Sequence, residues 1–315
     1  MATSNTHYHH PVMLEESLAG LAIKPDGIYV DITFGGGGHS RAILERLTTG
    51  KLFSFDQDAD AAAIAATIKD KRFKFIQSNA RFMENFLVFH KIQRVDGIIA
   101  DLGVSSHQID TAERGFSTRL DGPLDMRMDQ STDLTASYVI NKYPYQDLQK
   151  IFFEYGELRN AIAIAKAIVA AREKQPITTT SMLKELVLPF APPKQHAQFL
   201  AKVFQALRIE VNNEIGILKV WLDQSRDFLT RNGRLVVISY HSLEDRIVKR
   251  FIKTGNCEGK VEMDLYGNTY IPIEPIKTKV TIPTEAEIAA NPRARSAKLR
   301  VGEKCIEEPS ARKFE

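Results

Sequence analysis

Residues 29–40 constrain the fold more than any other part of this 315-residue chain. Apolar residues up to Phe34 lead into four consecutive glycines at 35–38, and a helix-like run follows at 41–47. This order predicts a buried strand, a tight turn and a helix that opens against a ligand. Glycine lets the backbone approach a bound molecule, and a helix start offers free N–H groups. A run of glycines also occurs in plain turns, so the motif alone leaves both interpretations open.

The next predicted strand, residues 51–55, ends on Asp56. In doubly wound folds an acid about 20 residues past the glycine turn holds the ribose hydroxyls of a nucleotide. The glycine turn and the acid together favour a ribonucleoside cofactor.

The composition limits the class of protein. With 43% hydrophobic and 26% charged residues the chain is typical of a globular protein. A net charge of +3 leaves any binding of nucleic acid to local basic patches. The two cysteines, Cys257 and Cys305, form no C-x-x-C pair, so we expect no structural metal and no disulfide framework. Residues 1–10 do not resemble a signal peptide, and no apolar run is long enough to span a bilayer, which predicts a cytoplasmic protein without a membrane partner.

Strand and helix patterns alternate along the first hundred residues. We expect strands at 28–34, 52–56, 73–77 and 97–101, with helices at 39–48, 58–69 and 80–91. Such alternation predicts a Rossmann-like, doubly wound, mostly parallel α/β sheet with helices on both faces. A fifth strand, residues 234–240, comes only after a long gap. Because a crossover needs only about a dozen residues, that gap must hold something else.

The gap has helical character. Residues 160–172 are apolar nearly all round, as in a buried helix, and residues 196–221 repeat apolar residues at helical spacing. We therefore predict a core formed by residues 1–106 and 201–315, and an all-helical insert at 107–200 rooted after the fourth strand. A single larger domain with extra helices is the alternative.

The C-terminal third carries basic segments. Residues 242–253 predict a helix with Ser242 and Asp245 as a capping-box variant and a basic side that is either solvated or in contact with phosphates. Alternating residues at 269–271 and 277–282 predict strands that complete the sheet. Residues 291–300 read as a second phosphate-contacting segment or as a charged edge strand.

Polar residues gather where the predicted strands end. His39 follows the glycines, Asp56 ends the second strand, Asp101 ends the fourth, and His241 follows the fifth. In an open α/β sheet ligands bind beyond the carboxyl ends of the strands, so one site could collect all four. Singly, each has an ordinary explanation as a helix cap or a structural histidine.

Seven motifs carry a family resemblance. They are FGGGGHS at 34–40, DLGVSS at 101–106, ERGFS at 113–117, DGPLDMRM at 121–128, FQALRI at 204–209, SLEDR at 242–246 and NPRARS at 291–296. In this order, within a stretch from Tyr8 to Arg300, they resemble the RsmH (MraW) family. That family comprises S-adenosylmethionine-dependent methyltransferases that modify N4 of a cytidine in the decoding centre of bacterial 16S ribosomal RNA.

The resemblance implies roles for particular residues. It implies that Gly37, Gly38 and His39 line the methionine end of S-adenosyl-L-methionine and that Asp56 binds the ribose. It further implies that Asp101 and Gln108 complete the pocket, and that the helical insert recognises RNA.

The chain departs from the family pattern at two places. Ala80 stands where the family has an aromatic residue against the cofactor, so a stacking contact of about 0.5–1.5 kcal/mol is either missing or supplied by Phe82. His107 replaces the family's proline before Gln108.

Methylation of an exocyclic amine needs no covalent intermediate, whereas methylation of cytosine C5 needs a thiolate. Neither cysteine lies at a strand end of the predicted sheet. We expect positioning to dominate catalysis, with Asp101 and the backbone of 102–104 as acceptors for the amine. His241 is the second candidate, as proton acceptor or base-positioning group.

Three other functions are compatible with parts of the sequence. A nicotinamide oxidoreductase shares the glycine turn and Asp56, and a non-catalytic RNA-binding factor would tolerate Ala80. A DNA amino-methyltransferase is disfavoured because Asp-Leu-Gly-Val replaces its usual Pro-Pro motif. The sequence gives no indication of the oligomeric state.

Overall fold

The computed structural model describes residues 11–263, 266–267 and 269–306; the leader at 1–10, with Tyr8, lies outside the described residues. The chain divides into two compact units. The first, here the sheet unit, comprises Met1–Gly103 and Gly216–Glu315. The second, here the helical unit, comprises Val104–Ile215. Each unit is described by itself.

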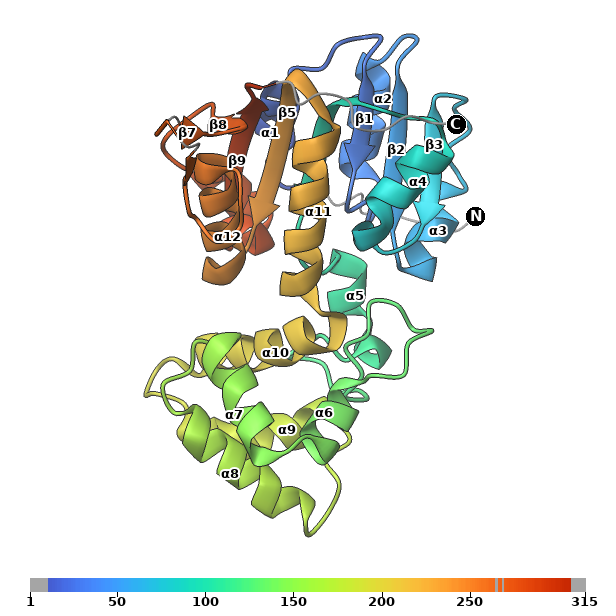
Figure 1. Cartoon of the computed structure of the whole chain (residues 1–315). Coiled ribbons are helices and arrows are strands. Elements are labelled where there is room, and N and C mark those ends of the chain that lie inside the picture. The colour runs from blue at the N-terminus through green and yellow to red at the C-terminus, as the bar shows by residue number, and fades with distance from the viewer. Residues whose placement is uncertain (1–10, 264–265, 268, 307–315) are drawn as a thin grey trace, which may run out of the picture. The chain divides into compact units, whose positions relative to one another are not determined.

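The sheet unit contains a seven-stranded sheet in the order β3-β2-β1-β4-β5-β9-β8 (Figure 1). β1 to β5 pair in parallel, and β9 pairs antiparallel with both β5 and β8. The predicted Rossmann-like, mostly parallel sheet is thereby confirmed. The strands are β1 (Ile28–Asp31), β2 (Lys51–Asp56), β3 (Phe73–Gln77), β4 (Val95–Asp101), β5 (Leu229–Ser239), β8 (Ile273–Pro275) and β9 (Lys298–Lys304).

Helices cover both faces of this sheet. They are α1 (Leu14–Leu21), α2 (Gly38–Arg46), α3 (Ala59–Ala65), α4 (Met83–Phe89), α11 (Glu214–Phe228), α12 (Ser242–Thr254) and α13 (Glu285–Ala290). α1 and α2 share a core cluster with Leu52, Ile99 and Val236 on one face. On the other face Phe55 packs edge-on against Phe86 of α4, and α4, α11 and α12 lie in front of the sheet in Figure 1.

The strand order reverses between β1 and β4, because the chain passes from β1 to β2 and β3 on one side and resumes at β4 on the other. The carboxyl ends of β1, β2, β4 and β5 meet at one edge of the sheet, where such folds bind ligands.

The C-terminal tail differs from its predicted form. β7 (Thr269–Tyr270) pairs with β6 (Glu262–Met263) in a separate small sheet, and residues 277–282 contribute only an isolated bridge at Thr281. Residues 292–296 form a 3₁₀ turn, and the strand that follows, β9, is internal and not an edge strand. Leu299 buries its side chain there, and β8 takes the edge instead.

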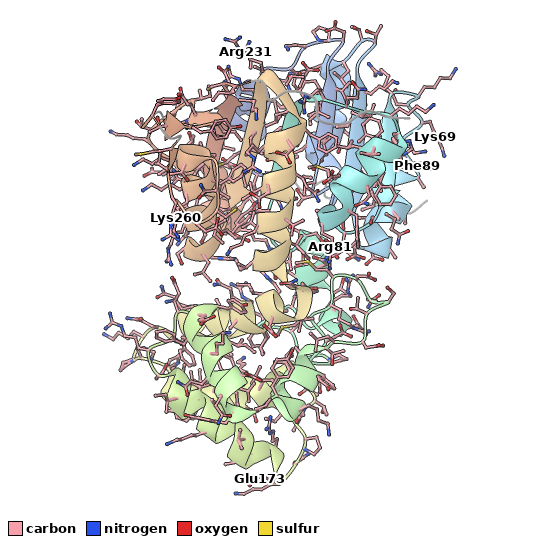
Figure 2. All side chains as sticks on the ribbon, viewed as in Figure 1. Lys69, Arg81, Phe89, Glu173, Arg231 and Lys260 are labelled. Atoms are coloured by element: carbon pink, nitrogen blue, oxygen red, sulfur yellow. The ribbon has the colours of Figure 1, made fainter. Side chains whose placement is uncertain are left out.

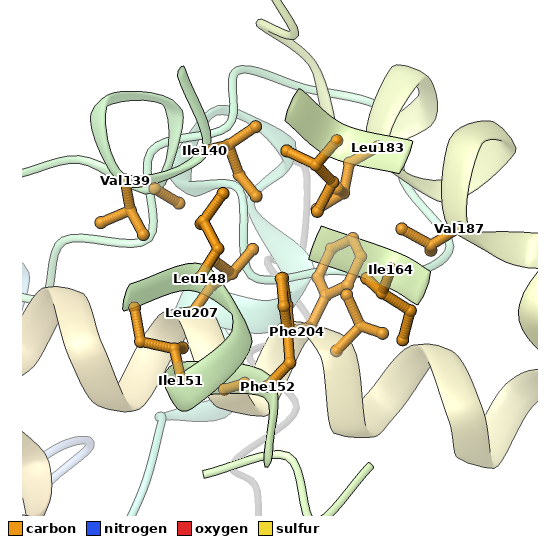
Figure 3. Close-up of a cluster of buried hydrophobic side chains, with 14 of the residues drawn as sticks. Val139, Ile140, Leu148, Ile151, Phe152, Ile164, Leu183, Val187, Phe204 and Leu207 are labelled. Carbon is orange, nitrogen blue, oxygen red and sulfur yellow. The ribbon is translucent and has the colours of Figure 1, made fainter. Parts of the chain in front are cut away.

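The helical unit has its own apolar core (Figure 3). Its helices are α5 (Ser106–Asp110), α6 (Ala136–Lys142), α7 (Tyr145–Glu154), α8 (Ala161–Arg172), α9 (Thr180–Val187) and α10 (His196–Asn212). This core includes the buried side chains of Phe152, Ile164, Leu183 and Phe204, each at most 4% exposed. Across the described residues no helix is both long and apolar enough to cross a membrane.

Three expectations about this region need correction. α8 is not buried all round, because Ile162 is 51% exposed while Ile164 and Ile168 face the core. The pattern at 196–221 is two helices, α10 and α11, separated by Asn213 in the left-handed conformation. The expected limit at residue 200 cuts through α10, whose buried side belongs to the core of the helical unit.

Candidate active site

The glycine turn presents bare backbone at the carboxyl end of β1. Gly37 has a φ of 76° and precedes α2, and no side chain caps that helix. A Cβ atom added to Gly35 or Gly36 would meet no atom within 4 Å, whereas one on Gly37 would lie 2.6 Å from the Phe34 ring. The turn is thus open at Gly35 and Gly36 and packed against the Phe34 ring at Gly37. The N–H groups at the start of α2 are suited to an anionic ligand group.

Asp56, at the end of β2, braces this turn. Its Oδ2 accepts a hydrogen bond from the Gly35 N–H at 2.8 Å, and its Oδ1 accepts one from the Asp58 N–H at 2.9 Å. Burial raises the pKa of Asp56, and the two N–H donors work against that rise. Because each carboxylate oxygen accepts more than one donor, the side chain can still receive ribose hydroxyls.

Asp101, at the end of β4, is linked to both neighbouring strands. Its backbone N–H donates to Thr33 Oγ1 at 2.6 Å, and its Oδ1 accepts a hydrogen bond from the Tyr240 hydroxyl at 2.8 Å. Burial raises the pKa of Asp101 to about 7, and the nearby carboxylates of Asp31 and Glu244 add to the rise. The sequence-based reasoning missed Tyr240; an aromatic residue at the end of the fifth predicted strand was the available signal.

Asp31 was also missed. It is 1% exposed and accepts hydrogen bonds from Ser40 Oγ at 2.6 Å and from the Thr33 N–H at 3.0 Å. Ser40 Oγ also lies 2.7 Å from Ser54 Oγ, so one buried cluster joins β1, β2 and α2. Burial raises the pKa of Asp31 to about 6. An acid within an apolar strand was the signal that could have found it.

His39 lies on α2 and is 6% exposed. Its Nε2 is 3.1 Å from the Val12 carbonyl oxygen, and burial lowers the pKa of the ring to about 4. The ring is therefore neutral at pH 7 and donates to that carbonyl. This contact holds the segment before α1 against the start of α2.

His241 is the N-cap of α12. Its Nδ1 lies 3.4 Å from the Glu244 N–H that donates to it, and Glu244 Oε2 accepts from the Tyr240 N–H at 3.0 Å. The expected capping pair of Ser242 and Asp245 is wrong, since Ser242 is already helical and Asp245 accepts from Arg300 at 2.7 Å. His241 Nε2 lies 3.1 Å from Glu244 Oε1, so the two ring nitrogens contact different parts of Glu244: Nδ1 its backbone N–H and Nε2 its carboxylate.

Ala80 begins a 3₁₀ turn after β3 that is capped by Asn79. Phe82, the suggested replacement for the missing aromatic, is 43% exposed, and the Arg81 guanidinium lies 5.1 Å from its ring centroid. Arg81 is at the surface near α4 (Figure 2). One face of the Phe82 ring is thus occupied by a cation.

Gln108 belongs to the helical unit. Its Oε1 accepts from the Ser105 N–H at 2.9 Å in the capping box of α5. Its predicted contact with the cofactor therefore stays a prediction, whereas the glycine turn, Asp56, Asp101 and Tyr240 share one edge of the sheet unit.

The arrangement fits S-adenosyl-L-methionine, the cofactor that the resemblance implies. Open backbone at Gly35 and Gly36 and an uncapped helix start suit the methionine carboxylate. Asp56 offers acceptors for ribose hydroxyls. The carboxylate of Asp101 lies at the same edge of the sheet and, in its ionised form, suits the neighbourhood of a cationic sulfonium.

Comparison with known sequences yields relatives along nearly the whole chain. A curated relative from Amoebophilus asiaticus, named ribosomal RNA small subunit methyltransferase H, is 63% identical and covers 94% of this chain and 96% of its own length. A relative of the same name from Flavobacterium johnsoniae is 56% identical and covers 96% of this chain and 99% of its own. Among solved structures, an rRNA methylase from Streptococcus thermophilus covers 92% of this chain and 93% of its own at 12% identity, with a TM-score of 0.39, too distant to add to the assignment.

The family model agrees with these relatives. The MraW methylase family matches residues 6–305, which include all seven motifs. Its cofactor is S-adenosyl-L-methionine, as expected from the motifs. The chain belongs to the MraW methylase family.

Proposed function

We propose that the protein transfers a methyl group from S-adenosyl-L-methionine to the exocyclic N4 of a specific cytidine in the decoding centre of bacterial 16S ribosomal RNA. The names of its relatives support ribosomal RNA of the small subunit as the substrate class. The observation that carries the reaction type is Asp101, held by Tyr240 and Thr33 at the switch point of the sheet.

The residues of the glycine turn hold the cofactor. Gly37, Gly38 and His39 are assigned to its methionine end, Ala80 to a further wall and Asp56 to the ribose. The contact of Gln108 with the cofactor is the prediction that the family resemblance implies. When bound, the cofactor supplies an electrophilic methyl group on a sulfonium.

Asp101 orients the target amine and accepts a proton from it. Tyr240 occupies Asp101 Oδ1, which leaves Oδ2 and the backbone of 102–104 to accept from the N–H groups of the cytosine. With the cofactor bound, this arrangement would hold the amine nitrogen in line with the methyl group; the S–C bond would break as the N–C bond forms, S-adenosylhomocysteine would leave, and the surplus proton of the amine would pass to an acceptor. With a pKa of about 7, Asp101 is partly ionised at neutral pH and can take that proton. His241 is the second candidate, although Glu244 already engages its ring.

The cysteines support an amine over a carbon target. Methylation of C5 requires a thiolate nucleophile. Cys257 is 4% exposed, and burial raises the pKa of its thiol to about 12. Burial also raises the pKa of Cys305. Both thiols are therefore protonated at neutral pH, and neither is poised to attack a pyrimidine ring.

The helical unit is the proposed RNA-recognition domain. Acidic and basic residues are equal in number between Val104 and Ile215, so this unit has no net positive charge to attract RNA. Recognition of RNA there must depend on shape and on local groups. We place the protein in the cytoplasm, where small ribosomal subunits are assembled.

Two experiments test this function. Mass spectrometry of 16S ribosomal RNA from a strain that lacks the protein should show one cytidine without its N4-methyl group, restored by the wild-type gene but not by Asp101→Ala. The purified protein with small subunits and labelled S-adenosylmethionine should restore the modification in vitro. A methyl group lost from C5 or from the 2′-hydroxyl would refute the assignment.

A further inference from the structure

A cavity of about 330 Å³ opens beside Tyr240, outside the predicted cofactor site. Residues from four segments of the sheet unit line it. They are Tyr240, His241 and Ser242 at the end of β5, Ile282 and Pro283, Ile288 of α13, and Arg295, Ser296, Ala297 and Lys298 at the start of β9. Because β9 runs antiparallel to β5, its first residue pairs with Ser239 and lies at the carboxyl edge of β5.

One wall of the cavity is cationic. Arg295 is exposed at the end of a 3₁₀ turn, and Lys298 has a 40% exposed side chain. Lys298 Nζ is 3.5 Å from Asp245 Oδ2, but Arg300 Nε approaches the same carboxylate more closely, at 2.7 Å. The negative charge of Asp245 is thus paired mainly with Arg300, and the ammonium group of Lys298 stays available to an anionic ligand. Ser296, which follows Arg295 in the chain, also lines the cavity.

Another part of the lining, here the apolar wall, is formed by Ile282, Pro283 and Ile288. Ile282 is 64% exposed although it borders the cavity. A cavity lined by an exposed isoleucine and by two cations suits a ligand with a flat apolar part and an anionic part. A nucleotide within RNA combines both, as a base and a phosphate.

We propose that this cavity holds a nucleotide next to the target cytidine, with its phosphate at Arg295 and Lys298 and its base against Ile282 and Ile288. Tyr240 ties the cavity to the reaction, because its side chain borders the cavity while its hydroxyl donates to Asp101. A nucleotide seated here lies one side chain away from the acceptor for the target amine. The inference rests on the proposed function in that it takes the substrate to be RNA.

The cationic wall is tested by RNA binding in the absence of turnover. A fluorescent RNA with the sequence around the target cytidine is titrated with the full chain at several salt concentrations. Arg295→Gln and Lys298→Gln should each weaken binding and make the plot of log affinity against log salt shallower by about one unit. The matched control is Lys260→Gln, an exposed lysine that does not line the cavity (Figure 2). Equal effects of the three variants would overturn the proposal.

The apolar wall has a separate readout. Ile282→Ser should weaken RNA binding severalfold at every salt concentration and leave the salt slope unchanged, since no charge is lost. Binding equal to wild type would remove the base from this wall and overturn the inference. Cofactor affinity, measured by calorimetry on each variant, should stay at the wild-type value.

Failure of the proposed function has a different signature. If the cavity variants weaken RNA binding but no N4-methylcytidine depends on the protein, the nucleotide site stands and the assigned reaction is wrong. If the modification is confirmed and all cavity variants bind RNA normally, the reaction stands and the cavity is not a nucleotide site.

Discussion

Burial raises the pKa of Asp101, and Tyr240 opposes that rise because its hydroxyl donates a hydrogen bond to one carboxylate oxygen. In Tyr240→Phe this hydrogen bond is absent, so the pKa of Asp101 rises. Ionised Asp101 then appears only at higher pH, and the acid limb of the kcat/KM profile for methyl transfer should move to higher pH.

The control for this shift is Tyr138→Phe, which removes a hydroxyl from an exposed tyrosine of the helical unit. Its profile should match that of the wild type. If the acid limb of Tyr240→Phe also stays in place, ionisation of Asp101 does not govern the rate, and Tyr240 serves only the packing of β5.

His241 separates a capping role from a catalytic one. His241→Ala removes the N-cap of α12 and should lower the free energy of unfolding by about 0.5–2 kcal/mol. His241→Asn supplies another capping side chain and should restore most of that stability. Thermal unfolding measures both variants.

Methyl transfer by the same two variants tests the alternative. If His241 accepts the amine proton, both variants should lose about 10²-fold or more in rate, including the stable His241→Asn. If His241 only caps the helix, the folded variants keep their rate. Glu244 contacts both ring nitrogens, with its backbone N–H at Nδ1 and its carboxylate at Nε2, and this makes the second result our expectation.

At the scale of elements, the turn between β1 and α2 allows a matched pair of substitutions. Gly36→Ala adds a methyl group to open space, so it should leave the melting temperature unchanged and weaken S-adenosylmethionine binding. Gly37→Ala places a Cβ at positive φ and against the Phe34 ring, which should cost roughly 1–2 kcal/mol of stability or more. Calorimetric titration and thermal unfolding distinguish the two. Unchanged cofactor binding by Gly36→Ala would place the cofactor elsewhere.

Most of the parallel part of the sheet could be predicted, because β1, β2 and β4 are short apolar runs that end in aspartate and β3 is a short run rich in aromatic residues that ends at Gln77. β3 lies at the predicted residues, and β1, β2 and β4 lie within a few residues of theirs. β9 could not be predicted in the same way, since Lys298, Arg300 and Lys304 interrupt its apolar residues. Lys304 is nevertheless 2% exposed, and its ammonium group donates to the Arg226 carbonyl, so partners formed in the folded chain override the charge.

The same limit explains the site residues that were missed or misassigned. The local pattern predicted that Asp56 and Asp101 end strands, which the structure confirms. The contact between Tyr240 and Asp101 depends on the pairing of β4 with β5, which no local pattern reports. Histidine is an uncommon N-cap, so Ser242, the next residue, was predicted to cap α12 in place of His241.

At the scale of the whole molecule, each unit has its own core, which predicts separable effects of core substitutions. Phe152→Ala in the helical unit removes a fully buried ring and should cost about 3–5 kcal/mol there. RNA binding should fall, while S-adenosylmethionine binding at low temperature changes little. The matched Phe251→Ala in the sheet unit should instead lower the temperature at which cofactor binding is lost. Equal loss of cofactor binding in both variants would mean that the units do not fold separately.

The position of the helical unit between β4 and β5 also affects how the protein is synthesised. At about 5–20 residues per second, the ribosome needs on the order of 10 s to pass from the end of β4 to the start of β5. Throughout that time one edge of β4 has no neighbouring strand, and an unpaired apolar edge invites association with other chains. A nascent chain arrested within the helical unit would therefore expose β4 and lack the contact between Tyr240 and Asp101, so aggregation and inactivity would share one cause.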